Sequence, residues 1–168
     1  MHSILSASRQ QSRRLEAFRK IRGLSLPSTE LLQAFPELKN ARSMVKNAKF
    51  QQAFDVISRC HDIVSRATGP SSALTFQLAL QKADVVRYFG NYKQASDIMQ
   101  SYEVSASSDE AITNIITKLQ VISLCTLQSG QAKKAVEIAA EAIDLCERKN
   151  ADTKLFSPCY AIKGRSFA

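Results

Sequence analysis

The sequence contains no tryptophan and only five glycines, four prolines and four cysteines among its 168 residues. Five scattered glycines leave no glycine-rich loop of the kind that cradles phosphate groups. The longest uncharged apolar stretches, such as 121–125, are far shorter than the roughly 20 residues that cross a bilayer. We therefore expect no membrane span. With 45% hydrophobic residues, the chain has the composition of a globular domain, and its length predicts one domain with a sizeable core.

The cysteines show no paired short spacing of the kind that holds zinc, and only two histidines could assist them. Cys60 and His61 are adjacent, so in a helix their side chains point about 100° apart and do not form a nucleophile and base pair by spacing alone. We find no other catalytic constellation and expect neither an enzyme nor a cofactor. Buried free thiols are the favoured interpretation of the cysteines, with two disulfides as the alternative: Cys60, Cys125, Cys146 and Cys159.

Acidic residues are nearly absent from residues 1–29, where six arginines and lysines face Glu16 alone. This segment supplies most of the net charge of +8, and Leu15, Phe18 and Ile21 form an apolar stripe if it is helical. An Arg-rich, Ser-rich, acid-poor segment is typical of a mitochondrial presequence. We therefore expect a mitochondrial leader at 1–29 and a separate domain at 30–168. For segment 1–29, the alternatives are a basic disordered arm, an ordinary first helix of the domain or a nucleic-acid-binding arm. For the location of the protein, the alternative is the cytoplasm.

Small residues recur at a spacing near 40. Aligning segments 46–57, 88–99 and 128–139 places one small residue and, five positions later, one alanine in each segment, with spacings of 42 and 40. A further small residue lies seven positions upstream, and that series continues to Gly164. We interpret most of these as positions where neighbouring helices pack closely: Ala41, Ala83, Ser123 and Gly164; Gly90 and Gly130, which align with Ala48; Ala53, Ala95 and Ala135.

Apolar and small residues recur every three or four positions rather than every two, which predicts helices and almost no strand. Pro36 and Pro70 stand where helices begin, and segments 69–72 and 105–109 are typical of loops. One helical hairpin cannot bury its own apolar face, so about three stacked hairpins are the minimum for stability.

This pattern resembles the tetratricopeptide repeat superfamily, in its longer variety of about 40 to 42 residues that kinesin light chains carry. Phe50 and Tyr92 match the aromatic position of the second helix of a repeat, and Tyr160 with Gly164 matches the large and small pair of the first helix. Lys82 departs from the pattern at an apolar position. The resemblance implies an all-α, right-handed solenoid of antiparallel helix hairpins, with three TPR-like repeats and an incomplete fourth.

The resemblance also implies that the first helix of each hairpin lines a concave groove for an extended peptide or a partner helix. The polar and aromatic positions of this expected partner-binding face are Arg42, Lys46, Gln77, Asp84, Arg87, Tyr88, Gln120 and Gln128. The alternative is that these eight residues are simply solvated positions of amphipathic helices. We also interpret Lys133 and Lys134, which are not among the eight, as a solvated face. Segment 160–167 is a second candidate interface.

We therefore expect a non-enzymatic scaffold or adaptor that binds proteins in mitochondria. The alternatives are an organellar RNA-associated helical-repeat protein and a cytosolic adaptor similar to kinesin light chains.

Overall fold

The computed structural model describes residues 28–104 and 109–149, and within these ranges every regular element is a helix. This confirms the expected all-α class. No described helix combines the length and apolar character needed to cross a bilayer. Most of the expected leader, together with Cys159, Gly164 and segment 160–167, lies outside the described residues. The helices are α2 (Thr29–Ala34), α3 (Leu38–Lys46), α4 (Phe50–Thr68), α5 (Ala73–Tyr88), α6 (Tyr92–Gln100), α7 (Asp109–Gln128) and α8 (Ala132–Arg148).

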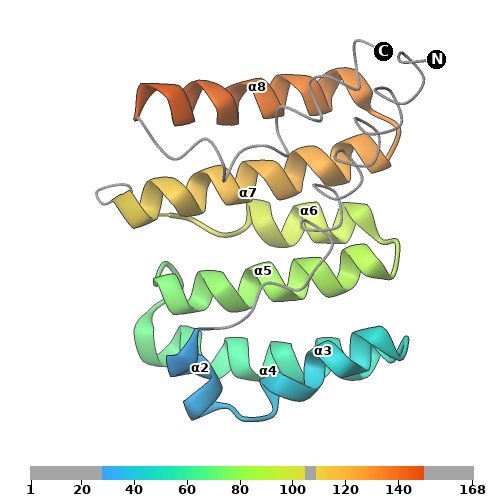
Figure 1. Cartoon of the computed structure of the whole chain (residues 1–168), viewed down its shortest axis with the longest axis vertical. Coiled ribbons are helices and arrows are strands. Elements are labelled where there is room, and N and C mark those ends of the chain that lie inside the picture. Colours follow the sequence, from blue (N-terminus) through green and yellow to red (C-terminus); the bar gives the residue numbers. More distant parts are fainter. Residues whose placement is uncertain (1–27, 105–108, 150–168) are drawn as a thin grey trace, which may run out of the picture.

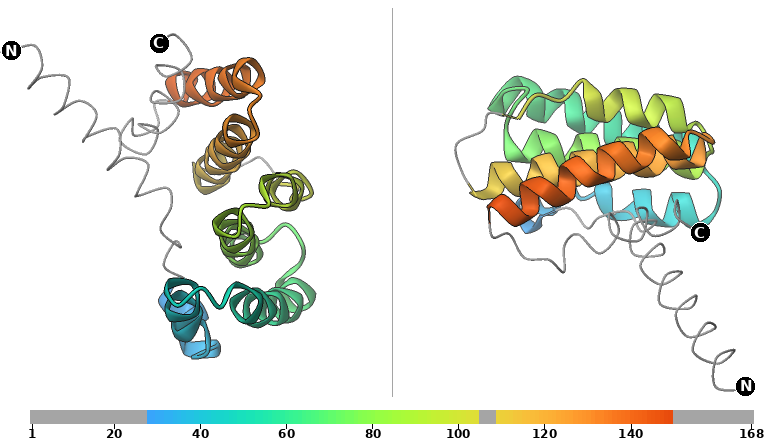
Figure 2. Two further views of the ribbon diagram at one scale, coloured as in Figure 1. Left: turned by 90° about the vertical axis from the view of Figure 1, so that its right-hand side faces the viewer. Right: turned by 90° about the horizontal axis from the view of Figure 1, so that it is seen from above.

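From α3 onward, each helix packs against the next one along the chain, and α5 also contacts α7. Figure 1 shows the resulting stack, from α3 and α4 to α8. Three short turns, joining α3 to α4, α5 to α6 and α7 to α8, lie on the same side of the stack, at the right in Figure 1. The end-on view in Figure 2 shows the helices running side by side. We call the side that carries the three turns the turn edge.

The three turns share one backbone conformation. Ala48, Gly90 and Gly130 have φ of 57°, 93° and 85°, the left-handed conformation that commonly ends a helix. In each turn the next N–H donates back to a carbonyl five residues earlier, at 2.8 Å from Lys49 and at 3.1 Å in the other two turns. This repeated cap has the spacing of 42 and 40 residues that the sequence shows.

Gly90 and Gly130 therefore do not have the packing role that the sequence analysis assigned to them. A Cβ built on either glycine meets no atom within 4 Å, so no neighbouring helix requires a small residue there. What these positions require is a positive φ, which glycine adopts without steric strain. Ala48 adopts the same conformation at the cost of strain between its Cβ and the backbone.

The alanines of the second helices lie in the core. Ala53, Ala95 and Ala135 each have 0% of their surface exposed, and the positions four residues later, occupied by isoleucine, methionine and alanine, are equally buried. The first helices present Ala41, Ala83 and Ser123, which are also buried. In the third hairpin the Ser123 hydroxyl donates a 2.7 Å hydrogen bond to the Ala135 carbonyl, which joins the two small positions directly.

Helix α5 lies between α4 and α6 and is buried on most of its circumference. Its N-terminus is capped by Ser72, whose hydroxyl accepts a hydrogen bond from the Thr75 N–H at 3.2 Å. Lys82, which departs from the repeat pattern, lies with its ammonium 5.6 Å from the centre of the Phe54 ring, a cation–π distance. The stem and charge of this lysine are therefore accommodated at a position where an apolar residue is typical.

The short helix α2 adds a contact that the repeat pattern does not predict. Ser28 caps it by accepting a hydrogen bond from the Leu31 N–H, and Leu31 is buried in the cluster that contains Leu38 and Leu78. The Ser28 N–H donates to the Gln77 side-chain oxygen at 3.0 Å. Helix α2 is thus anchored to α5 through its N-cap residue.

Three of the four cysteines lie within the described residues, and all three are buried free thiols, as predicted. Burial raises the pKa of the Cys60 and Cys125 thiols to about 11, and for Cys60 the neighbouring Glu37 carboxylate adds to the effect. At neutral pH these groups are protonated, so they pack as small apolar side chains.

Candidate functional site

The eight residues expected on a partner-binding face fall into different environments. Arg42 and Lys46 are exposed on α3. Gln77 is half-buried, and its side-chain oxygen already accepts the hydrogen bond from Ser28. Gln120 is half-buried on α7. These four residues are not gathered into one pocket by the structure.

Asp84 and Arg87 are buried, which differs from the expectation that they face a partner. Their side chains are only 5% and 3% exposed, and the carboxylate and guanidinium form an ion pair at 3.1 Å. They lie one turn apart on α5, the helix covered by α4, α6 and α7, so both charges are removed from water together. Their observed role is an internal pair within the stack.

The two remaining residues of the set, Tyr88 and Gln128, lie at one pocket, which Arg87 also reaches. Arg87, Tyr88 and Gln128 line a pocket of about 250 Å³ together with Tyr92, which matches the aromatic position of the second helix of a repeat. The Arg87 guanidinium lies 5.7 Å from the centre of the Tyr88 ring. The Gln128 side-chain oxygen is buried with no hydrogen-bond partner among the described residues. The lining of this pocket thus combines two aromatic rings, an amide and a guanidinium.

Phe89 is the surface residue that the sequence analysis missed. It is 71% exposed and directly follows Tyr88, which is 37% exposed, and the only other large hydrophobic side chain exposed to this degree in the described ranges is Ile63 at 50%. Its ring meets the Phe50 ring edge-on, with centroids 6.0 Å apart. Phe89 also borders a pocket of about 230 Å³, whose other apolar lining residues are Phe50, Phe54, Val85 and Val86.

The repeat register shows that the turns do not require aromatic residues at these two positions. Relative to the left-handed residues of the three turns, Tyr88 and Phe89 correspond to Lys46 and Asn47 in the first hairpin and to Gln128 and Ser129 in the third. The same turn conformation forms with polar residues in those two hairpins. The exposed aromatic pair is therefore particular to the second hairpin, and the signal for it in the sequence is the pair immediately before the turn glycine.

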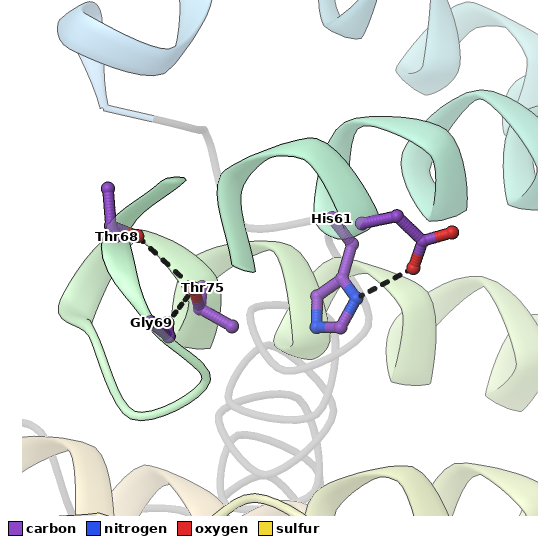
Figure 3. Close-up of polar contacts among 5 residues, drawn as sticks. His61, Thr68, Gly69 and Thr75 are labelled. Atoms are coloured by element: carbon purple, nitrogen blue, oxygen red, sulfur yellow. Dashed lines mark hydrogen bonds and ion pairs between the residues drawn. The ribbon is translucent and has the colours of Figure 1, made fainter. Parts of the chain in front are cut away.

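A third pocket, of about 300 Å³, lies between α4, α5 and α6 and contains His61, Ser65 and Lys82. Figure 3 shows His61 on α4 and, at the loop that follows this helix, the hydrogen bonds that join Thr68 and Gly69 to Thr75. The His61 Nδ1 lies 3.8 Å from an Asp62 oxygen, and burial, followed by the charge of Lys82, lowers the pKa of this imidazole. No cysteine lines this pocket, so Cys60 and His61 are not brought together in it.

Comparison with known proteins found no match to this chain among family models, curated proteins or solved structures.

Proposed function

We propose that this chain is a non-enzymatic adaptor or scaffold of the tetratricopeptide-like kind, which binds a partner protein through the turn edge around Tyr88 and Phe89. Its hairpins would stack as a right-handed solenoid, and the unit-specific side chains on the stack would select the partner. The partner would be an extended peptide or a helix, the two forms of chain that helical stacks bind through side-chain pockets.

The exposed aromatic pair is the observation that most supports this proposal. Aromatic side chains are enriched at protein interfaces, and tyrosine is among the residues that contribute most to binding energy when they become buried there. Tyr88 borders the pocket of about 250 Å³, and Phe89 borders the pocket of about 230 Å³. Since the first and third hairpins form the same turn without aromatic residues, folding alone does not account for the pair.

Affinity purification of the tagged full-length chain, with quantitative mass spectrometry, tests this proposal. The Phe89→Ser variant is expected to lose the proteins that co-purify with the wild-type chain. Ile63→Ser is the matched control, because it also removes an exposed apolar side chain, from α4 away from the turns. Retention of all partners by Phe89→Ser, or equal losses with both variants, would refute a binding role for the turn edge.

We further propose that the adaptor acts in mitochondria, on the basis of the acid-poor, arginine-rich segment 1–29. A fusion of this segment to a fluorescent protein is expected to colocalise with a mitochondrial marker. A diffuse cytosolic signal would instead favour the cytosolic alternative, and it would leave the binding proposal untouched.

A further inference from the structure

We infer that the partner of the turn edge is an acidic protein segment that inserts an apolar side chain beside Phe89. This inference rests on the proposed function and specifies the chemistry of the partner. It concerns three segments of nine residues each, 46–54, 88–96 and 128–136, which contain the three turns and the first residues of α4, α6 and α8.

The turn edge carries charge of one sign. Its three segments contain five lysines and no aspartate or glutamate, and all five lysines are exposed: Lys46, Lys49, Lys93, Lys133 and Lys134. Every hairpin contributes at least one of them. Since the three turns lie on the same side of the stack (Figure 1), these charges form a row beside the exposed aromatic pair.

Within the described residues, no ion pair neutralises this row of lysines. None of the five lysines lies within ion-pair distance of a carboxylate in the described ranges. An acidic residue does occur on each second helix, at Asp55, Asp97 and Glu137, but it lies one turn further from the edge. The lysine charges are therefore available to an external carboxylate, and a row of them steers an acidic partner toward this edge.

The positions of the lysines are also unfavourable for the helices that carry them. Helices α4, α6 and α8 have no acidic residue in their first turn, where the helix dipole favours negative charge. Lys93, Lys133 and Lys134 instead place positive charge there. Helix stability alone would select the opposite charge, so recognition of an acidic partner explains this pattern better than folding does.

The pocket beside Phe89 supplies the apolar part of the recognition. Phe50, Phe54, Val85 and Val86 line it, and its volume of about 230 Å³ provides room for a bulky side chain. The edge-on contact with Phe50 holds the Phe89 ring against the rim of this pocket. A partner side chain that enters the pocket would cover the most exposed aromatic ring in the described ranges.

These features favour an acidic protein segment over RNA, which is also anionic and stacks on aromatic rings. Arginine is the basic side chain best suited to nucleic-acid recognition, and the three segments contain none. The neighbouring Arg87 is buried in its ion pair with Asp84. A lined apolar pocket fits a leucine or an aromatic side chain better than it fits a base, which stacks on an open ring face.

The test is a binding titration of the full-length chain with three fluorescent probes. The first is a short peptide rich in Glu and Asp with a central pair of leucines, the second replaces the leucines with serines, and the third is single-stranded oligouridine of the same length. We expect the first probe to bind more tightly than the other two, by about tenfold for the loss of the apolar anchor. Its affinity should also fall as salt is added.

Variants separate the charge contribution from the apolar one. The double variant Lys133→Gln and Lys134→Gln should weaken binding of the first probe about fivefold, the effect of two exposed ion pairs. The matched control, Arg66→Gln and Lys149→Gln, removes two exposed positive charges from the far ends of α4 and α8 and should change little. The circular dichroism spectrum of each variant is compared with that of the wild-type chain to check that the variant is folded.

Three results would overturn the inference: equal binding of both peptides, tighter binding of oligouridine, or equal losses in the two double variants. The adaptor proposal would survive any of them if Phe89→Ser still lost its co-purifying proteins. If Phe89→Ser retains every protein that co-purifies with the wild-type chain, the adaptor proposal itself fails. Binding of the acidic peptide would then lack a natural counterpart.

Discussion

The left-handed turn residues Ala48 and Gly90 allow alanine and glycine to be exchanged in both directions, with opposite expected effects on the free energy of unfolding. Ala48 has φ of 57°, in the region where an L-residue is strained by about 1–2 kcal/mol relative to glycine. Glycine in turn loses more backbone entropy on folding, by about 0.5–1 kcal/mol. The difference between the midpoints of these two ranges predicts that Ala48→Gly stabilises the protein by about 0.75 kcal/mol. Gly90→Ala should destabilise it by a similar amount, because no atom lies near the added Cβ and only the backbone strain changes.

The assay is urea unfolding followed by circular dichroism, with wild type and variants in the same buffer. Ala67→Gly is the control, because Ala67 lies in the last turn of α4 and glycine should destabilise an ordinary helical position. A loss of stability in Ala48→Gly as large as that in Ala67→Gly would refute the left-handed turn at Ala48 and with it the shared geometry of the three turns.

Three further perturbations address the core and the buried polar groups. Ser123→Ala removes the 2.7 Å hydrogen bond to the Ala135 carbonyl and should lower the free energy of unfolding by about 1 kcal/mol. An unchanged free energy of unfolding would contradict the contact between α7 and α8 at this position. Asp84→Ala removes the carboxylate that pairs with the buried Arg87 guanidinium and should destabilise the protein by about 3 kcal/mol, whereas replacing both residues with leucine should recover most of the loss. The fold lowers the pKa of His61 below 6.5, so the folded protein favours the neutral imidazole. The stability that depends on the neutral form is fully present above pH 6.5, and it is lost as the pH falls through the lowered pKa. His61→Gln should therefore reduce the fall in urea midpoint on acidification, and an unchanged pH profile would argue against burial of the imidazole.

Sequence periodicity was sufficient to locate the buried small positions, because they follow the spacing of the repeat. Ala53, Ala95 and Ala135 are each fully buried where the second helix of a hairpin packs. The same periodicity marked Gly90 and Gly130 for a different reason than the one inferred, since a recurring small residue can reflect either close packing or a positive φ. Only the backbone geometry distinguishes the two.

The candidate surface was harder to predict, because exposure depends on which helices cover a residue. Asp84 and Arg87 have the polar character of surface residues, yet three neighbouring helices bury α5 and the two charges neutralise each other. Phe89 has the character of a core residue, yet it lies at the turn edge, beyond the helices that could cover it. Helical periodicity assigns a side chain to one face of its own helix and carries no information on the helices packed around it.

Site-specific photo-crosslinking tests the central claim most directly. A photoreactive phenylalanine analogue is placed at Phe89 of the full-length chain in cells, and the same analogue at Ile63 serves as the comparison. The account predicts a protein adduct from position 89 that is absent from position 63, with the adduct's attachment site in an acidic segment of the partner. No adduct at position 89, or the same adducts from both positions, would contradict it.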